Sequence, residues 1–414
     1  MITSFSTALS ALSAHSTAID VVGNNLANLN TAGFKESVVS FHDLVTQSLG
    51  AGLGETQVGF GVGTPVTLRQ FSQGAIQSTG GPMDAAIQGD GFFVVKGDAN
   101  QQLYTRGGNF QVDTDGNLTT ATGERVQGWT TTNNVLDVNA PIGDITVPVG
   151  SLKAPITTTR FSADLNLDST ATVGPPPTKF ATPLEVYDSL GNSHVITTTF
   201  TKTANAGEWD YSLAFPDSDL TAAGTSVTGT ITFDSNGKMI SPAVTDPPPV
   251  LVAAGLKDGA SDMSITWNLF NGSTPRLTQF SQPSATSALE QDGAPPANLV
   301  RVGLGNGGKL LAQYSDGLQV LMGQMAMATV RNPQSLIAAG NSNFQISARS
   351  AVPAIGLPET GGRGSVLGGN VEASTVDIAK QFTNLIVYQR GYQANTRVIT
   401  TVDEISQETI NLKH

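Results

Sequence analysis

The sequence predicts a mixed α and β fold, in which long N- and C-terminal helices form a coiled-coil-like pair with two nested antiparallel β domains between them. Three observations support this prediction. Apolar residues recur at helical spacing near both termini, the middle of the chain is rich in β-branched and aromatic residues, and Gly, Asn, Asp and Pro punctuate that middle part. A chain of 414 residues is long enough for two or three domains.

The first helix is expected to start near Phe5 and to extend for about 25 residues. Its apolar residues follow a seven-residue repeat, which is typical of coiled coils. The other faces carry Ser, Thr, Ala and Asn where a solvent-facing helix would carry Lys and Glu, so we expect this helix to be surrounded by neighbours. The residues expected to pack between chains here are Phe5, Leu9, Leu12, Ile19, Val22 and Leu26.

The end of this helix is expected to be a joint that leads into the β domains. Asparagine side chains can cap helix carbonyls or amides and tolerate unusual backbone angles, and a glycine permits a turn. An ordinary helix C-terminus with solvated asparagines is the alternative interpretation. The expected joint residues are Asn24, Asn25, Asn28, Asn30, Gly33 and Phe34.

Between the helices the sequence predicts antiparallel strands joined by tight turns. Dipeptides such as Asp115-Gly116 and Asn236-Gly237 are typical of hairpins, and proline clusters near 174–178, 246–250 and 293–298 indicate linkers or loop tips. The clearest strand segments are GFFVV at 91–95, HVITTTFTK at 194–202, TGTITFDSNGKMI at 228–240 and SDMSITWNLF at 261–270.

The last helix is expected to begin at Ser374, which forms an S-x-x-D start signal with Asp377, and to extend for about 37 residues. The glycine-rich segment 361–370 before it is interpreted as a flexible hinge. The apolar residues expected to pack between chains here are Ile378, Phe382, Leu385, Ile386, Tyr392, Ile399, Val402 and Ile405.

A nested layout follows from helices at both ends and β segments between them. We predict a terminal helical core domain from residues 1–30 and 371–414, and an inner β domain from 31–145 and 300–370, with a joint segment near 31–70. Residues 146–299 are predicted to form an outer β domain. Two helices alone would leave much apolar surface, so their missing partners are expected to be other copies of the chain.

Composition argues against several classes of partner. The net charge is −12 with no cluster of Lys or Arg, whereas binding to nucleic acid needs a positive surface. No apolar stretch approaches the roughly 20 residues that span a bilayer, and we expect no membrane insertion. The first basic residue is Lys35, so no secretory signal peptide is expected, and the absence of cysteine excludes disulfides.

Motifs for catalysis or cofactor binding are weak. The segment GLGNGGK at 303–309 matches G-x-G-x-x-G, but a strand-like sequence follows it, so we interpret it as a glycine-rich β loop. The segment VDTDGNLTTATGE has glycine at the wrong position for a calcium loop, so we expect a hairpin turn. The four histidines, His15, His42, His194 and His414, lack metal-ligand spacing. We expect no enzyme activity, cofactor or metal.

Four long segments carry a resemblance to a known family: 24–35, 60–95, 105–129 and 374–414. They are similar to the bacterial flagellar rod and hook proteins. The rod proteins are much shorter, whereas this chain has an extra β region that includes PLEVYDSLGNSHVITTTFTK at 183–202, which looks like the outer domain of a hook protein. The resemblance therefore implies a hook subunit.

The resemblance implies a tubular homopolymer outside the cell, with the terminal helices as its inner core, which acts as a flexible universal joint and transmits motor torque from the rod to the filament. It also implies export through the flagellar type III apparatus, a hook cap protein, a distal rod protein and a hook-filament junction protein as partners. Two alternatives remain open. The chain could be another axial protein, from the distal rod or the junction, or a secreted β-rich adhesin or hydrolase.

Overall fold

The computed structural model describes residues 2–44, 46–49, 56–132, 135–150, 152–222 and 224–411. The chain divides into two compact units. The first unit contains residues 1–149, 301–313 and 319–414, and the second contains 150–300 and 314–318. The expectation of a terminal helix at each end with mostly β structure between them is confirmed. The side chain of His414 lies outside the described residues.

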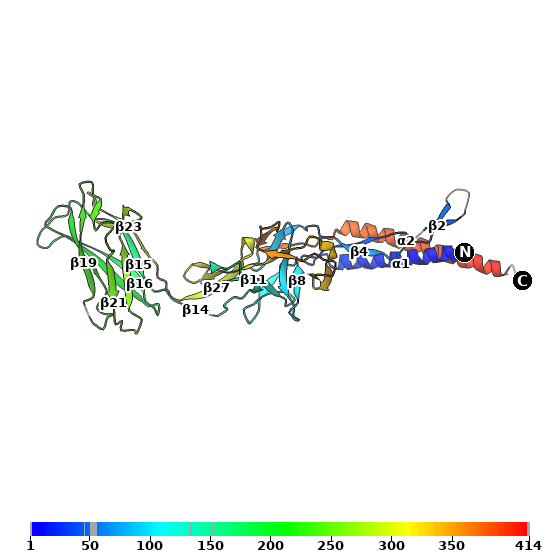
Figure 1. Ribbon diagram of the computed structural model, residues 1–414, viewed down its shortest axis with the longest axis horizontal. Coiled ribbons are helices and arrows are strands. Elements are labelled where there is room, and N and C mark those ends of the chain that lie inside the picture. The colour runs from blue at the N-terminus through cyan, green and yellow to red at the C-terminus, as the bar shows by residue number, and fades with distance from the viewer. Residues whose placement is uncertain are drawn as a thin grey trace. The chain divides into compact units, whose positions relative to one another are not determined.

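The two helices of the first unit pack against each other, and they lie side by side in Figure 1. Helix α1 (Ile2–Ala27) has 26 residues and α2 (Ile378–Asn411) has 34. Small side chains let them approach closely: Ala14 and Ala18 of α1 are buried, and a Cβ at Gly391 of α2 would lie 2.6 Å from the His15 ring. Burial lowers the pKa of His15, which favours a neutral imidazole in this contact.

The start of α2 differs from the expected one. Asp377, and not Ser374, is the N-cap, because its Oδ1 accepts a hydrogen bond of 3.1 Å from the backbone N–H of Lys380. The helix start predicted from the S-x-x-D pattern is therefore about one turn too early. The residues before Asp377 continue from a strand, and the backbone N–H of Thr375 donates to the Phe34 carbonyl (3.1 Å), which holds them in an extended path.

The largest sheet of the first unit has the central strand order β28-β29-β11-β7-β8-β32-β31, and its described pairs are antiparallel. The unit boundary falls inside β27 and at the end of β28. The strands of this sheet and its attached ribbons are β7 (Phe92–Lys96), β8 (Gln102–Thr105), β9 (Phe110–Val112), β10 (Leu118–Thr120), β11 (Arg125–Thr132), β12 (Val135–Leu136), β13 (Gly143–Asp144), β27 (Ala297–Leu304), β28 (Lys309–Tyr314), β29 (Gln319–Met325), β30 (Met327–Thr329), β31 (Ile337–Gly340), β32 (Asn343–Gln345) and β33 (Ala354–Gly356).

Four two-stranded antiparallel ribbons complete the first unit, together with two short 3₁₀ turns, η1 (Asn306–Gly308) and η2 (Pro333–Ser335). The ribbons are β1 (Ser37–Ser40) with β4 (Val66–Arg69), β2 (Thr46–Leu49) with β3 (Thr56–Gly59), β5 (Ile76–Ser78) with β35 (Asn370–Glu372), and β6 (Ala85–Gln88) with β34 (Ser365–Gly368).

The expected flexible hinge at 361–370 is wrong for the second half of that segment. Residues 365–368 form β34, which pairs with β6, and Val366 is fully buried. Two of the glycines allow other backbone segments to approach closely. A Cβ at Gly364 would lie 2.2 Å from the Gln88 carbonyl oxygen, and a Cβ at Gly368 would lie 2.1 Å from the Leu304 carbonyl oxygen. Composition indicated flexibility because it cannot reveal these neighbouring backbones.

Aromatic side chains form the core next to the largest sheet. Phe92, Tyr104 and Phe344 are buried together, and the rings of Phe71 and Phe344 meet edge to face at 5.1 Å. This geometry is favourable for aromatic pairs. The core therefore supports β7, β8 and β32, which are consecutive in the strand order of the sheet.

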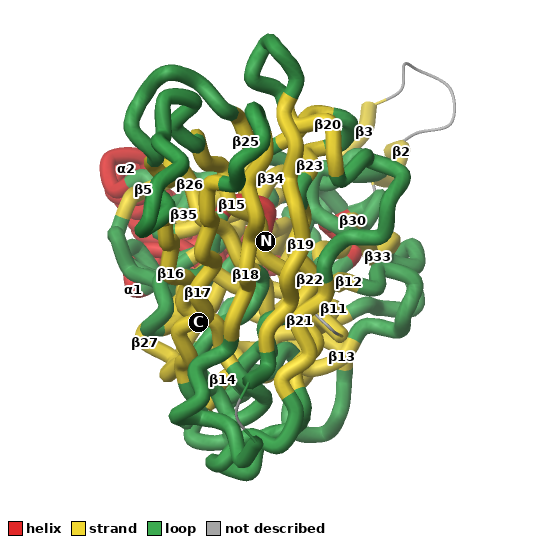
Figure 2. The backbone as a smooth tube through the Cα atoms, turned by 90° about the vertical axis from the view of Figure 1, so that its left-hand side faces the viewer, coloured by secondary structure: helices red, strands yellow, loops and turns green. Residues whose placement is uncertain are grey.

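Two five-stranded sheets surround one core in the described part of the second unit. One sheet has the order β16-β17-β18-β19-β20, and Figure 2 shows its first four strands side by side. The other has the order β21-β22-β15-β25, with β26 also paired to β15. The bounds are β14 (Leu152–Lys153), β15 (Arg160–Asn166), β16 (Lys179–Tyr187), β17 (Ser193–Lys202), β18 (Glu208–Ala214), β19 (Ser226–Phe233), β20 (Met239–Ser241), β21 (Val250–Ala253), β22 (Met263–Asn268), β23 (Phe270–Asn271), β24 (Thr274–Pro275), β25 (Leu277–Thr278) and β26 (Ala285–Gln291).

The purely antiparallel prediction is wrong for one strand of the second unit. β15 pairs in parallel with β22 and β25, and antiparallel with β26. A parallel pair needs a long connection, and the whole β16–β20 sheet provides it here. The predicted strand at 194–202 is confirmed as β17, which alternates buried and less buried residues. Its buried face packs on Trp267, whose ring stacks on Phe161 at 5.7 Å.

Candidate functional site: a buried polar joint beside two helix faces

The end of α1 is closed by its own asparagines. The Asn28 side chain donates a 2.9 Å hydrogen bond to the backbone carbonyl of Asn24, and the Asn28 backbone N–H donates to the Asn24 and Asn25 carbonyls. These bonds satisfy carbonyls that the end of a helix leaves without partners. Asn24 and Asn28 also line a cavity of about 540 Å³, which Arg69 of β4 and Asn341, in the turn between β31 and β32, border as well. Asn30 is exposed.

Asn25 has a different position from the other asparagines, because its side chain is buried. Its Nδ2 donates to the Ser37 carbonyl (2.8 Å), and its Oδ1 accepts from the Ser37 backbone N–H (3.0 Å). The same Nδ2 lies 3.3 Å from Oε1 of Gln381 in α2. Asn25 thus binds both backbone groups of the first residue of β1 and contacts the other helix.

Gly33 and Phe34 form the turn that follows. Gly33 has φ of +69°, a conformation that glycine adopts at little cost, and its N–H donates to the Glu372 carbonyl at 2.7 Å. Phe34 is buried, and the guanidinium carbon of Arg69 lies 6.0 Å from the centre of its ring. Burial lowers the pKa of Arg69 from its ordinary value. The turn therefore brings the segment after α1 against the segment before α2.

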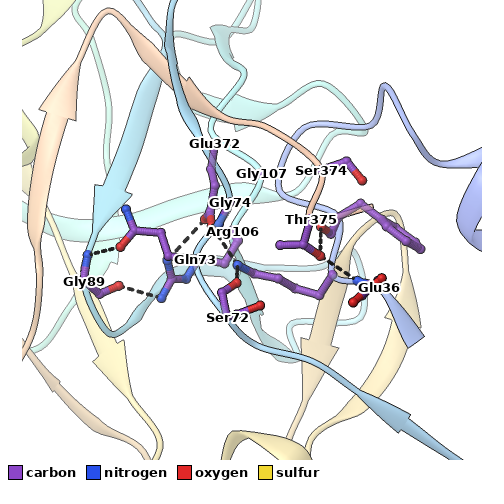
Figure 3. A network of polar contacts seen from close by, with 12 residues as sticks. Glu36, Ser72, Gln73, Gly74, Gly89, Arg106, Gly107, Glu372, Ser374 and Thr375 are labelled. Atoms are coloured by element: carbon purple, nitrogen blue, oxygen red, sulfur yellow. Dashed lines mark hydrogen bonds and ion pairs between the residues drawn. The ribbon is translucent and has the colours of Figure 1, made fainter. Parts of the chain in front are cut away.

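Glu372 lies at the centre of a buried ionic network, which Figure 3 shows. Its Oε1 is 2.7 Å from Lys35 Nζ and accepts a 2.6 Å bond from the Gly74 backbone N–H, and its Oε2 is 3.2 Å from Arg106 Nη1. The Lys35 and Glu372 side chains are fully buried, and that of Arg106 is 5% exposed. We call Lys35, Arg106 and Glu372 the joint triad.

Backbone carbonyls accept one further hydrogen bond from each cation of the triad. Lys35 Nζ donates to the Ser72 carbonyl (2.6 Å), and Arg106 Nη2 donates to the Gly89 carbonyl (2.8 Å). Burial lowers the pKa of Lys35, and the contact with Glu372 opposes this shift. Two cations surround one carboxylate, so Glu372 stabilises more buried charge than any other acidic residue of the joint.

Glu36 connects the joint to the first turn of α2. Its Oε1 lies 2.9 Å from Lys380 Nζ, and its Oε2 accepts a 2.9 Å bond from Gln381 Nε2. The Glu36 backbone N–H donates to Thr375 Oγ1 at 2.8 Å, which Figure 3 also shows. Asn25, Glu36 and Gln381 therefore form one continuous polar chain from the end of α1 to the start of α2.

The predicted assembly residues fall into three groups in this structure. Val22 is buried, whereas a second group is partly exposed: Leu12, Ile19, Leu26, Leu385, Ile399 and Val402. The remaining ones are exposed large apolar side chains: Phe5, Leu9, Ile378, Phe382, Ile386, Tyr392 and Ile405. Val387 and Val398 of α2 share this exposure although the sequence pattern did not select them. Apolar surface thus remains on both helices after they pack together.

Two motifs that the sequence analysis set aside have the expected structures. After Leu304 the chain makes the 3₁₀ turn η1 and enters β28 at Lys309, so the glycine-rich segment is a β loop, as predicted. Asp113 closes the predicted hairpin turn between β9 and β10, because its Oδ1 accepts bonds from the N–H groups of Asp115 (2.9 Å) and Asn117 (2.7 Å). None of the helices in the described ranges is long and apolar enough to cross a membrane.

The joint can be tested through its most buried asparagine. We expect Asn25→Leu to lower the free energy of unfolding of the first unit by about 2–4 kcal/mol, because Ser37 would lose partners for both its N–H and its C=O. Hydrogen exchange in increasing urea, measured on peptides from β7 and β11, would report this free energy. The control Asn28→Leu, which removes a bond at an exposed position, is expected to cost about 1 kcal/mol or less. Equal losses for the two variants would contradict the role of Asn25.

Four family models match the chain, each over a different range. They are described as "Flagella basal body rod protein" (residues 5–35), "Flagellar hook protein FlgE/F/G D1 domain" (86–162), "Flagellar basal body protein FlaE D2 domain" (166–294) and "Flagellar basal body rod FlgEFG protein C-terminal" (367–412). The first range contains α1 from Phe5 onward and the turn at Gly33, and the last contains β35 and α2. Both sides of the joint therefore lie within matched ranges.

Complete relatives are similar along their whole length. The flagellar hook protein FlgE of Borreliella burgdorferi is 32% identical over 456 residues, covering 100% of both chains. That of Salmonella typhimurium is 31% identical, covering 99% of this chain and 100% of the relative, and that of Escherichia coli is 30% identical with the same coverage. Among solved structures, Helicobacter pylori flagellar hook protein FlgE2 is similar in fold, with a TM-score of 0.51 at 13% identity, over 70% of this chain and 99% of that one.

Proposed function

The chain belongs to the flagellar hook protein family, and we propose from this that the exposed faces of α1 and α2 bind other copies of the chain in the wall of the hook. As a member of this family it is a structural subunit of the bacterial flagellar hook, outside the cell. The observation that carries the proposal is the apolar surface that both helices keep after they pack on each other. Phe382 is 52% exposed and Ile386 is 54% exposed, one turn apart on α2.

Burial of these side chains between chains would be strongly favourable. Apolar surface removed from water contributes about 25 cal/mol per Å², and a large side chain contributes about 1.5–3 kcal/mol when it is fully buried. A polymer in which each subunit presents several such side chains gains this energy many times. The coiled-coil-like pairing of α1 with α2 and the seven-residue repeat of α1 would then supply the geometry for knobs-into-holes contacts between neighbours.

The domain division proposed for this function has three parts. Residues 1–30 and 371–414 form the terminal helical core, 31–145 and 300–370 form the inner β domain with the joint, and 146–299 form the outer β domain. The separate family-model matches at 5–35, 166–294 and 367–412 and the compact second unit, which includes residues 150–300, support this division. In this division the polar joint lies where the helical core meets the inner β domain.

The joint and the domain surfaces have complementary roles in this proposal. The joint triad and Asn25 hold the two helices firmly to the β strands of the first unit, so that torque passes between the helices and these strands. Only 13% of residues are charged, so neighbouring copies would have few ion pairs to break when they shift during bending. Such a subunit acts in a universal joint. We also infer export by the flagellar type III apparatus, and contacts with a hook cap protein, a distal rod protein and a hook-filament junction protein.

The role of the helix faces can be tested by shortening two of their apolar side chains. We expect the double substitution of Phe382 and Ile386 by alanine to raise the critical concentration for polymerisation about a hundredfold or more, because two contacts of roughly 1.5–3 kcal/mol each are removed. Sedimentation and electron microscopy of the purified chain would measure this. The free energy of unfolding of the monomer is expected to change by about 0.5 kcal/mol or less per site, since both side chains are exposed.

The matched control replaces Gln389 and Gln393 by alanine. These residues have the same spacing on α2 and are exposed, but they offer little apolar surface. We expect their variant to polymerise within a fewfold of the unchanged chain. Equal critical concentrations for the two double variants would show that the apolar faces do not drive assembly.

A further inference from the structure

Three side chains of types that can bind a metal ion converge in the second unit, although one of them, Asp258, is far from the other two in the sequence. Asp188 follows β16, His194 lies in β17, and Asp258 lies in the loop between β21 and β22. Their ligand atoms all lie within 4.8 Å of one another. His194 Nε2 is 3.2 Å from Asp188 Oδ2 and 3.6 Å from Asp258 Oδ2. The histidine spacings in the sequence gave no sign of this group, because its third member comes from a different sheet.

The site is built so that two of these ligands are already oriented. Asp188 Oδ1 accepts bonds from the backbone N–H groups of Leu190 (2.8 Å) and Asn192 (2.9 Å), which leaves its Oδ2 facing His194. Asp188 is fully buried and His194 is nearly so. Fixed ligands lose little conformational freedom when they bind a metal ion.

His194 has the second contact that metal-binding histidines usually make. Its Nδ1 lies 2.8 Å from Asp219 Oδ2. When Nδ1–H donates to this carboxylate, Nε2 carries a lone pair that faces Asp188 and Asp258. On another side, the Phe215 ring lies 5.1 Å from the imidazole ring and limits its rotation. Asp219 therefore acts as the orienting residue of the group.

The charge of the group also favours a cation. Three carboxylates surround one imidazole, and no Lys or Arg within the described ranges forms an ion pair with Asp188 or Asp258. Lys257 acts electrostatically on Asp219 and donates a hydrogen bond to the Ser218 carbonyl. A divalent cation between the two carboxylates would compensate negative charge that a single imidazole cannot balance.

A fourth ligand is available from Asn192. Its amide nitrogen lies 3.0 Å from Asp258 Oδ2 and 3.3 Å from Asp188 Oδ2. Rotation of the amide group by a half turn places its oxygen at the same position. Asp258 is the most exposed of the three ligands, with 27% of its side chain accessible, so it provides the entry side for an ion.

We propose that Asp188, His194 and Asp258 bind one divalent transition-metal ion of the Zn²⁺ class, with Asn192 or water as the fourth ligand. One imidazole nitrogen and carboxylate oxygens in a group of three protein ligands suit Zn²⁺ better than Ca²⁺, which takes six to eight oxygen ligands. The bound ion would connect the β16–β17 hairpin to the loop before β22. It would therefore stabilise the second unit, independently of the assembly faces on α1 and α2.

The test uses the full-length chain without a histidine tag, stripped of metal with a chelator. We expect calorimetric titration with ZnCl₂ to show one site per chain, and Zn²⁺ to raise the melting temperature of the second unit. Co²⁺ in place of Zn²⁺ is expected to give the visible absorption of a tetrahedral site. Asp258→Asn and His194→Gln are expected to weaken Zn²⁺ binding about tenfold or more, and Asp219→Asn is expected to weaken it about 10- to 100-fold.

The matched control is Asp210→Asn, which removes an exposed carboxylate of β18 that contacts Thr230 and not this group. We expect it to bind Zn²⁺ as the unchanged chain does. Asp258→Asn keeps the proposal testable if His194→Gln does not fold, because Asp258 is partly exposed and Asn can still accept the bond from the Ala260 N–H. Any one of three results would overturn the proposal. These are no Zn²⁺ binding at concentrations up to about 1 mM, unchanged Zn²⁺ binding in Asp258→Asn, and binding of Ca²⁺ but not of Zn²⁺.

Discussion

Replacing Glu372 by glutamine is expected to lower the free energy of unfolding of the first unit by about 3–5 kcal/mol. The substitution keeps the shape of the side chain and leaves an oxygen that can accept the bond from the Gly74 N–H. It removes the only carboxylate in contact with Lys35 and Arg106 among the described residues. Two buried cations would then lack a compensating charge. Hydrogen exchange of β7 and β11 peptides in increasing urea would measure the loss.

Two further variants separate the charge effect from a general sensitivity of the joint. Lys380→Met removes an ion pair with Glu36 in which the lysine is 53% exposed, and we expect a loss of about 1 kcal/mol or less. Adding Lys35→Met to Glu372→Gln removes one of the two uncompensated cations, so the double variant is expected to be more stable than Glu372→Gln alone. A loss below about 1 kcal/mol for Glu372→Gln would contradict the central role of this carboxylate.

The substitution Gly33→Ala is expected to have an effect of similar size, about 2–5 kcal/mol on the same free energy. A Cβ at this position would lie 2.4 Å from the carbonyl carbon of Arg106 and 2.4 Å from the backbone nitrogen of Gly107. Both atoms belong to backbone next to the joint triad, so a side-chain rotation cannot relieve the overlap. The positive φ of +69° adds its own cost for alanine.

Gly80→Ala separates these two costs. Gly80 has φ of +67°, close to that of Gly33, but a Cβ there would have no atom within 4 Å. We expect this control to lose about 1–2 kcal/mol, which is the cost of the backbone conformation alone. The same exchange measurement applies to both variants. If Gly33→Ala lost no more than Gly80→Ala, the close approach between residues 33 and 106 would not matter for stability.

The helices and many strands could be predicted because their signals are local. Apolar spacing located α1 and α2, and alternation located β17, since burial on one face imposes a fixed period on the sequence. The start of α2 was misplaced by one turn because Ser374 and Asp377 are both good caps. The parallel pairing of β15 could not be predicted, because it depends on which strands the core brings together after a long connection.

The joint was located from the sequence, but its contacts were not. The asparagines and Gly33 marked a break after α1, since these residue types favour caps and turns. The joint triad was missed because Lys35 and Glu372 are 337 positions apart, and no local pattern connects them. The one available signal was the rarity of charge. Lys35 is the first basic residue of a chain with few charged residues, and such a residue next to a helix end is a candidate for a specific partner.

The joint also determines the route of mechanical load through the chain. The Gly33 N–H donates to the Glu372 carbonyl, and the Glu36 side chain contacts Lys380 and Gln381. The segment after α1 is therefore bonded directly to the segment before α2 and to the first turn of α2. A pull on one terminal helix therefore reaches the other through a few short bonds and bypasses more than three hundred intervening positions. Because these contacts involve only residues 33–36 and 372–381, changes of length elsewhere in the chain would leave the connection between the two ends in place.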